Sequence, residues 1–200
     1  MKRIAIFASG SGSNAENIIT YFQNNKKAKV VCVLSNNPNA RVLERATNLG
    51  VKNGVFNKGQ LNDPKWAIEN LKNFDLIVLA GFLWKFPDHI LENYQNKVVN
   101  VHPALLPKFG GKGMYGENIY KAVLENKEVE SGISIHFVNQ NYDEGEIIFQ
   151  ESFILSPDES LNSLTTKVHE LEQSLFPKII EKTLLITTLV TLVNFMHPTL

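Results

Sequence analysis

The sequence predicts an α/β protein of three layers, in which helices cover both faces of a central sheet. Two observations support this class. Over roughly the first hundred residues, short apolar runs alternate with segments of helical periodicity, as in βαβ units. After residue 101, two strand-like runs follow one another without a helix between them, so they can pair as antiparallel strands. We therefore expect a Rossmann-like parallel sheet that C-terminal strands extend into a mixed sheet.

Apolar runs and helix signals define the elements of the first half. Gly50 closes one helix, and Asp63-Pro64 opens another, because proline is favoured at the first helical position. Ala67, Leu71 and Phe74 then follow at helical spacing. The expected strands cover residues 4–8, 30–34, 51–56, 76–80 and 98–101, and the expected helices cover residues 14–24, 41–49 and the segment after Pro64.

The second half begins with a long loop rich in proline and glycine. A helix is expected at residues 117–126, strands at 132–138 and 146–153, and a closing helix at 160–182. The closing helix has an apolar face formed by Leu161, Leu164, Val168, Leu171, Leu175 and Ile179. No linker or repeat interrupts residues 1–182, which we interpret as a single domain.

Residues 183–200 form an atypical apolar tail. From residue 184 to 196 it is almost wholly Leu, Ile, Val, Thr, Phe and Met, which is shorter than the roughly 20 residues needed to span a bilayer. Its composition permits a helix with a narrow polar stripe or a strand. We interpret it as a packed terminal element, with an oligomer interface as the alternative, and we expect a monomer or homodimer.

Composition excludes several classes of protein. Twenty basic and twenty acidic residues give a net charge of zero, which argues against a nucleic-acid or membrane partner. The single Cys32 lies in an apolar run and fits a reducing compartment, so we expect a cytoplasmic protein. The apolar run at the amino terminus is too short for a signal peptide and is interpreted as the first strand.

A glycine-rich turn joins the first strand to the first helix at residues 8–14. Backbone N–H groups and the positive end of the helix dipole meet there, so the turn predicts a phosphate site, with a bare turn as the alternative. The run is not a triphosphate-binding P-loop, and it lacks the third glycine of a dinucleotide fingerprint. Ser13 and Glu16 have the spacing of a capping box.

Asn100 and His102 lie two positions apart where an apolar strand meets a loop stiffened by prolines. Residues i and i+2 of a strand point to the same side, so both side chains should face one cleft. Asp143, in the loop after the 132–138 strand, is the expected partner that keeps His102 protonated near neutral pH. The amide of Asn100 can donate to an oxyanion. These three residues are the predicted catalytic group.

Other chemistries lack their signatures. No pair of histidines has a metal-ligand spacing with supporting Cys or His residues, so no metal site is predicted. No nucleophile elbow and no cysteine beside a histidine is present, which argues against a covalent acyl-enzyme. We therefore expect direct transfer between two substrates.

Four segments together resemble the glycinamide ribonucleotide transformylases, a family of folate-dependent formyltransferases. They are Ser9-Gly-Ser-Gly-Ser-Asn14, Leu79-Ala-Gly-Phe82, Asn100-Val-His-Pro-Ala-Leu-Leu-Pro107 and Tyr142-Asp-Glu-Gly145. The resemblance covers about residues 2–182, in the family's order, and implies the formyltransferase fold with one catalytic domain. The third segment combined with the later Asp-x-Gly carries most of the specificity.

The resemblance implies transfer of a formyl group from 10-formyltetrahydrofolate to the amine of 5′-phosphoribosylglycinamide, a step of purine synthesis. It implies protonated His102 and Asn100 at the oxyanion, and Asp143 raising the pKa of His102 and ordering a water that carries the proton. The implied ribonucleotide-binding residues are Gly12, Ser13, Asn14, Ala15, Glu16, His169, Glu170 and Glu172. The implied folate-binding residues, acting largely through backbone groups, are Leu83, Trp84, Lys85, Phe86, Asn100, Asn139, Gln140, Asn141, Tyr142 and Asp143.

The sequence departs from the family at two places in the site. Trp84-Lys85 stands where family members often carry an arginine, and the contacts of the lid-like loop at residues 110–116 are not assigned. Two alternatives use the same fold, namely formyltetrahydrofolate deformylase and methionyl-tRNA formyltransferase, and both carry a further domain that this sequence does not show. A nucleotide-binding sensor without catalysis is the more distant alternative.

Overall fold

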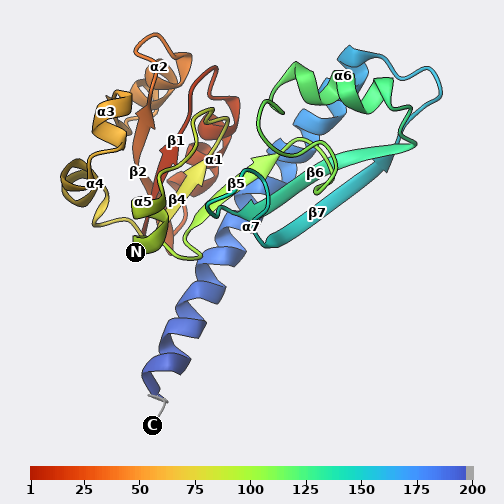
Figure 1. Ribbon diagram of the computed structural model, residues 1–200. Coiled ribbons are helices and arrows are strands. Elements are labelled where there is room, and N and C mark those ends of the chain that lie inside the picture. The colour runs from red at the N-terminus through yellow and green to blue at the C-terminus, as the bar shows by residue number, and fades with distance from the viewer. Residues whose placement is uncertain (197–200) are drawn as a thin grey trace.

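The computed structural model describes the backbone of residues 1–196 and the side chains of residues 1–185 (Figure 1). Its sheet contains β1 (Lys2–Phe7), β2 (Ala28–Ser35), β3 (Lys52–Val55), β4 (Leu76–Leu79), β5 (Val98–His102), β6 (Glu130–Phe137) and β7 (Ile147–Ile154). The helices are α1 (Ser13–Gln23), α2 (Arg41–Asn48), α3 (Lys58–Leu61), α4 (Pro64–Leu71), α5 (Asp88–Asn93), α6 (Glu117–Glu125) and α7 (Leu161–Met196).

The strands form one mixed sheet in the order β3-β2-β1-β4-β5-β6-β7. The first five strands in this order pair in parallel, whereas β5–β6 and β6–β7 pair antiparallel. The predicted fold class is therefore confirmed. The chain order reverses between β1 and β4, and in open α/β sheets ligands bind beyond the carboxyl ends of the strands at such a point.

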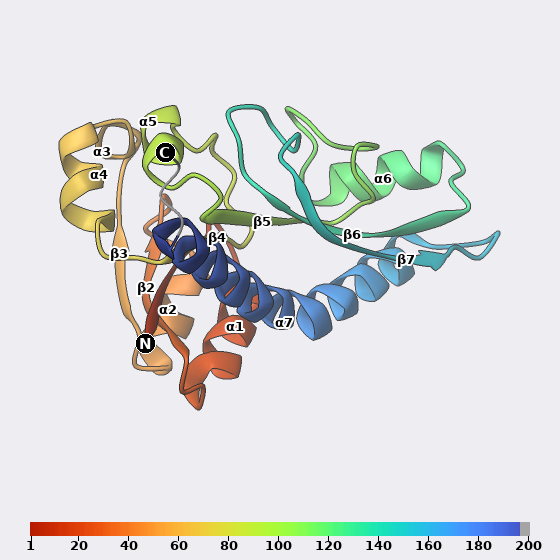
Figure 2. The ribbon, with the colours of Figure 1, turned by 90° about the horizontal axis from the view of Figure 1, so that it is seen from below.

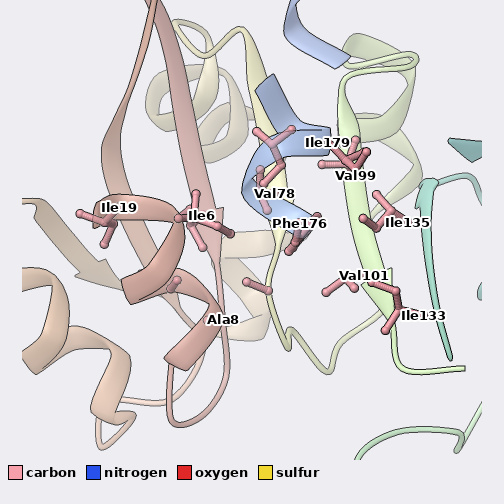
Figure 3. Packing of buried hydrophobic residues seen from close by; sticks show 14 of the residues in the cluster. Ile6, Ala8, Ile19, Val78, Val99, Val101, Ile133, Ile135, Phe176 and Ile179 are labelled. Carbon is pink, nitrogen blue, oxygen red and sulfur yellow. The ribbon is translucent and has the colours of Figure 1, made fainter. Parts of the chain in front are cut away.

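Two apolar clusters build the core on the two faces of the sheet, because neighbouring residues of a strand point to opposite faces. Ile6 belongs to one cluster and Phe7 to the other. The first cluster packs Ile6 and neighbouring strand residues against Phe176 of α7 (Figure 3). The second packs Phe7 and Ile77 against α4 and α5. Figure 2 shows α1 and α7 on one side of the sheet and α4 and α5 on the other.

The helix boundaries follow local signals in most places. Asp63 caps α4 by accepting a hydrogen bond from the Lys65 amide at 2.9 Å, with Pro64 as the first helical residue. Gly50 takes φ +68° just after α2 and ends it, as predicted. The prediction omitted α3 and α5, which contain four and six residues and are too short to show a helical period.

The predicted capping box at the start of α1 is wrong. Gly12, with φ 77°, is the N-cap residue, and no side chain caps the helix. Ser13 is already the first helical residue, and the side chain of Glu16 contacts Arg45 instead. The left-handed conformation of Gly12 starts the helix one residue earlier than the S-x-x-E pattern requires.

Helix α7 is longer than predicted. It runs from Leu161 to Met196 and includes Pro177, so there is no break at residue 182. Phe176, Ile180 and Leu184 are buried against the first cluster, whereas Leu185 is 43% exposed. Figure 1 shows the last turns extending beyond the sheet. For the tail, the sequence permits a helix or a strand, and the backbone is helical as far as residue 196. Side chains from residue 186 onward lie outside the described part. Within residues 1–196, no helix is long and apolar enough to cross a bilayer.

Candidate active site

A cavity of about 500 Å³ lies beyond the carboxyl ends of β4 and β5. Asn100 and His102 line it from β5, and Asp143 lines it from the loop between β6 and β7. Asn14 of α1 and Glu172 of α7 line it as well. The three residues of the predicted catalytic group therefore meet in one cavity, together with two of the residues implied for the ribonucleotide.

His102 and Asp143 form the central pair of the cavity. Nδ1 of His102 lies 3.6 Å from Oδ2 of Asp143, and both side chains are largely buried. Asp143 adopts φ 57°, and its Oδ2 accepts a hydrogen bond of 2.9 Å from the backbone N–H of Gly111. Nε2 of His102 lies 2.8 Å from the carbonyl oxygen of Phe109, to which it donates in one tautomer. The loop at residues 109–111 thus holds both members of the pair.

The pKa of His102 is lower than that of an ordinary histidine. Burial lowers it, and the Asp143 carboxylate, the Phe109 carbonyl and the Glu172 carboxylate raise it by less. The expectation that Asp143 keeps His102 protonated near neutral pH is therefore corrected: the carboxylate acts in the expected direction, but desolvation of the ring outweighs it.

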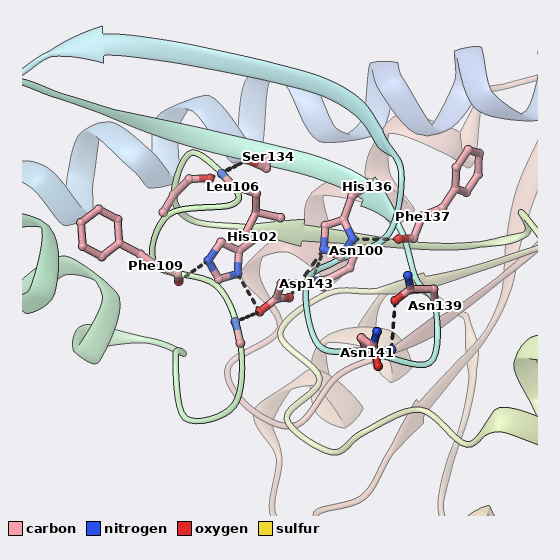
Figure 4. A network of polar contacts seen from close by, with 12 residues as sticks. Asn100, His102, Leu106, Phe109, Ser134, His136, Phe137, Asn139, Asn141 and Asp143 are labelled. Atoms are coloured by element: carbon pink, nitrogen blue, oxygen red, sulfur yellow. Dashed lines mark hydrogen bonds and ion pairs between the residues drawn. The ribbon is translucent and has the colours of Figure 1, made fainter.

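His136, which is not among the predicted site residues, lies beside the catalytic group (Figure 4). It pairs with Asn100 across β5 and β6, and the amide nitrogen of Asn100 lies 3.1 Å from its Nε2. Its Nδ1 lies 2.8 Å from the carbonyl oxygen of Phe137. With the proton on Nδ1, Nε2 accepts from the Asn100 amide and fixes the orientation of that amide. Asp143 lies 3.7 Å from the same Nε2, so it is flanked by two imidazoles.

The loop at residues 110–116, for which the sequence predicts no specific contacts, lines the cavity from Gly111 to Gly116. Its turns use glycine where φ is positive, as at Gly111 with φ 101° and Gly113 with φ 91°. Tyr120 of α6 continues this wall and is buried. The run of closely spaced glycines is the only sequence signal that pointed to this wall.

Among the residues implied for the ribonucleotide, Asn14 and Glu172 line the cavity, and the others do not. Glu172 is 7% exposed; its Oε2 accepts a 2.8 Å hydrogen bond from the Asn14 amide and lies 3.4 Å from Nδ1 of His169. The hydrogen bond between His169 and the Glu172 carboxylate raises the pKa of His169. Glu170 is exposed and does not line the cavity, because it points away from Glu172 on the helix. Ala15 is fully buried in the core, so only its backbone is available to a ligand.

The residues implied for the folate are likewise only partly at the cavity. Leu83 and Tyr142 line it and are 52% and 40% exposed. Trp84 and Lys85 line a neighbouring cavity of about 500 Å³ that shares Leu83 and Tyr142. The side chain of Phe86 is buried, with its ring centroid 5.1 Å from that of Phe7, so the expected lining role is limited to its backbone. Asn139, Gln140 and Asn141, which were also implied for the folate, line neither cavity.

Comparison with known proteins identifies the family and supports the fold. A family model described as formyl transferase matches residues 2–180. The chain belongs to the formyl transferase family. The phosphoribosylglycinamide formyltransferase of Bacillus subtilis is 31% identical over 92% of this chain and 95% of its own length. A solved structure of glycinamide ribonucleotide transformylase 1 from Geobacillus kaustophilus superimposes with a TM-score of 0.83 at 31% identity, covering 92% of this chain and 99% of that one.

Two other relatives are longer than this chain. The trifunctional purine biosynthetic protein adenosine-3 of Drosophila melanogaster is 36% identical over 88% of this chain, which spans 13% of that protein. The chloroplastic phosphoribosylglycinamide formyltransferase of Arabidopsis thaliana is 33% identical over 90% of this chain, which spans 64% of it. The resemblance to a formyltransferase is therefore confirmed, and this family member is a one-carbon transferase. The alternative of a sensor without catalysis is set aside.

The donor of a formyl transferase is a formylated folate, and the cavity has the dimensions expected of a small-molecule site. Among the described residues, no group of three or more His, Cys, Asp and Glu side chains is arranged to hold a metal ion.

Proposed function

We propose that this enzyme transfers the formyl group of 10-formyltetrahydrofolate to the amine of 5′-phosphoribosylglycinamide, as a cytoplasmic step of purine synthesis. The observation that carries the proposal is the convergence of Asn100, His102 and Asp143 on one cavity that Asn14 and Glu172 also line. Similarity to proteins named phosphoribosylglycinamide formyltransferase supports the choice of acceptor.

In the proposed reaction, the lone pair of the neutral amine attacks the formyl carbon, and the bond between that carbon and the folate nitrogen breaks. The second hydrogen on the Asn100 amide nitrogen is available to the oxyanion, because His136 takes the first. His102 starts neutral, since burial lowers its pKa. The negative charge that develops on the formyl oxygen raises this pKa, so the ring takes a proton from the attacking nitrogen, through an ordered water, as the tetrahedral intermediate forms. The ring returns this proton through the same water to the folate nitrogen as that nitrogen leaves.

Asp143 has two tasks in this proposal. Its carboxylate stabilises the imidazolium that forms on His102, at 3.6 Å from Nδ1. It also orders the water that carries the amine proton to the leaving folate nitrogen. The N–H of Gly111 and the second imidazole, His136, hold the carboxylate in place while the charge moves. Preorganised charge and proximity then account for the rate enhancement without a covalent intermediate.

The two substrates approach from opposite sides of the catalytic group. The ribonucleotide phosphate lies at the amino terminus of α1, on the backbone of residues 12–16, with the ribose and glycinamide near Glu172. The folate lies near Leu83 and Tyr142, which are exposed at the cavity. The enzyme acts in this proposal as a monomer or homodimer on small molecules, without nucleic acid.

The test is to incubate the purified enzyme with both substrates and to follow folate absorbance. Loss of 10-formyltetrahydrofolate that requires the ribonucleotide, with formylated ribonucleotide as product, supports the proposal. Loss that proceeds equally without the ribonucleotide identifies a deformylase and contradicts it. Absence of turnover in the presence of both substrates also contradicts it.

A further inference from the structure

The glycine turn before α1 is held by the neighbouring helix α2. The backbone N–H of Val42 donates to the carbonyl oxygen of Gly10 at 3.2 Å. Nε of Arg45 donates to the carbonyl oxygen of Ser11 at 3.0 Å. Two consecutive carbonyl groups of the turn therefore point to α2, which keeps these electronegative atoms away from an anion at the start of α1.

The turn and α2 also touch closely. A Cβ atom on Gly12 would lie 2.5 Å from Cβ of Val42, so only glycine allows this approach. At the end of the turn, the N–H of Glu16 donates to the Gly12 carbonyl at 2.9 Å as the first helical hydrogen bond. The N–H groups before it, from Ser13 to Ala15, have no acceptor within α1, because the first turn of any helix leaves its N–H groups without helical partners.

Glu16 creates an electrostatic conflict at this position. Its carboxylate lies in the first turn of α1, which is where the proposed phosphate sits. Two anions at one helix terminus repel each other unless a cation lies between or beside them. The guanidinium of Arg45 contacts the Glu16 carboxylate, and the two side chains are 22% and 42% exposed. The same guanidinium thus contacts both a carbonyl of the turn and the acidic side chain beside it.

We propose that Arg45 is a positioning residue for the substrate phosphate: it fixes the Ser11 carbonyl toward α2 and neutralises Glu16, so that the turn accepts an anion. This inference rests on the proposed function, which places a phosphate there. Glu16 then contributes as the partner of Arg45 instead of as a ligand of the ribonucleotide.

The experiment is a charge cycle with Arg45→Gln, Glu16→Gln and the double variant. We expect Arg45→Gln to weaken binding of 5′-phosphoribosylglycinamide by on the order of tenfold, because Glu16 is left uncompensated beside the phosphate. The double variant should recover most of this loss. Affinity for the dephosphorylated riboside should change little in any variant, so the loss should be specific to the substrate that carries the phosphate.

The matched control is Arg41→Gln, which removes the same charge from an exposed position on the same helix. It should leave the ribonucleotide affinity unchanged. Arg45→Lys keeps the charge, so it should retain more affinity than Arg45→Gln; thermal unfolding of each variant shows whether it is folded. If Arg45→Gln binds the ribonucleotide normally, or the double variant is as weak as Arg45→Gln, the inference is wrong.

Failure of the inference differs from failure of the proposed function. Equal losses for the riboside and the ribonucleotide in Arg45→Gln would show a purely structural role and overturn the inference alone. If the unmodified enzyme itself binds the riboside as tightly as the ribonucleotide, then no phosphate is recognised, and the proposed site fails with it.

Discussion

Nδ1 of His102 and Oδ2 of Asp143 lie 3.6 Å apart, although one residue is in a strand and the other is in a distant loop. His102 is the last residue of β5, and Asp143 lies in the loop that joins the antiparallel strands β6 and β7. That loop folds back to the end of β5, where Gly111 donates its N–H to the same carboxylate oxygen. The antiparallel strands β6 and β7, which extend the parallel part of the sheet, therefore bring Asp143 to His102.

The contribution of Asp143 to the His102 ring can be measured directly. In Asp143→Asn the carboxylate that raises the pKa of His102 is lost while burial, which lowers it, remains. We therefore predict that this pKa moves down, and that kcat falls by on the order of 100-fold or more. An NMR titration of the His102 ring and steady-state kinetics measure the two effects.

Glu144→Gln is the control for this experiment. It removes a carboxylate from the same loop, where the side chain accepts a 2.7 Å hydrogen bond from Asn141 and does not line the cavity. It should change neither the titration nor kcat appreciably. A His102 pKa that is the same in Asp143→Asn and in the unmodified enzyme would remove the carboxylate from the mechanism.

The His102 ring itself should be needed for the chemical step and not for ribonucleotide binding. His102→Ala removes the group that takes the proton at the oxyanion, so we predict a loss of turnover of on the order of 1,000-fold. The ribonucleotide contacts proposed at Asn14 and Glu172 remain, so its dissociation constant should stay within about threefold by calorimetry. Near-normal turnover in the folate-absorbance assay would rule out the assigned role.

Much of this architecture could be predicted from sequence because it depends on local patterns. The alternation of apolar runs and helical periods gave the parallel strands, and the strand period placed Asn100 and His102 on one cavity. Elements without a period were missed: α3 and α5 have four and six residues. The sequence predicts a side-chain cap at Ser13 for the start of α1, whereas Gly12 in the left-handed conformation is the N-cap residue.

The rest of the site depends on contacts between distant segments, which no local pattern encodes. His136 fits the alternation of a packed strand residue, so its position in the sequence gives no sign of a role in the site. Its pairing with Asn100 across β5 and β6 places it beside the catalytic group. The Phe109 carbonyl and the Gly111 N–H act through backbone atoms, so their residue types carry no signal. The net pKa of His102 depends on burial, which a sequence gives only as an average.

The close approach of the turn to α2 makes a sharp prediction for two neighbouring glycines. Gly12→Ala places a Cβ 2.5 Å from Val42 and forces alanine to φ 77°, so we predict a destabilisation of about 2–4 kcal/mol. Gly10→Ala is the matched control, because nothing lies within 4 Å of its added Cβ. Urea unfolding of both variants gives the free energies. Equal stability of the two variants would contradict the close packing.

The buried imidazoles should make folding sensitive to mild acid. Burial lowers the pKa of both His102 and His136, whereas an unfolded histidine has a pKa of about 6.5. Below that pH the unfolded chain binds more protons than the folded one, so the free energy of unfolding falls as pH falls from about 6.5 toward the lowered values. Each ring contributes a slope of up to about 1.4 kcal/mol per pH unit, and this contribution disappears above pH 7 or so.

Two single variants separate this effect from general acid sensitivity. His136→Gln removes one of the two rings, so its free energy of unfolding, measured in urea between pH 8 and pH 5.5, should depend less steeply on pH. His169→Gln removes an exposed ring whose pKa is raised by Glu172 and which therefore stabilises the fold when protonated. Its loss should make the decline with acid steeper. If both variants decline like the unmodified enzyme, the buried rings do not control the acid response.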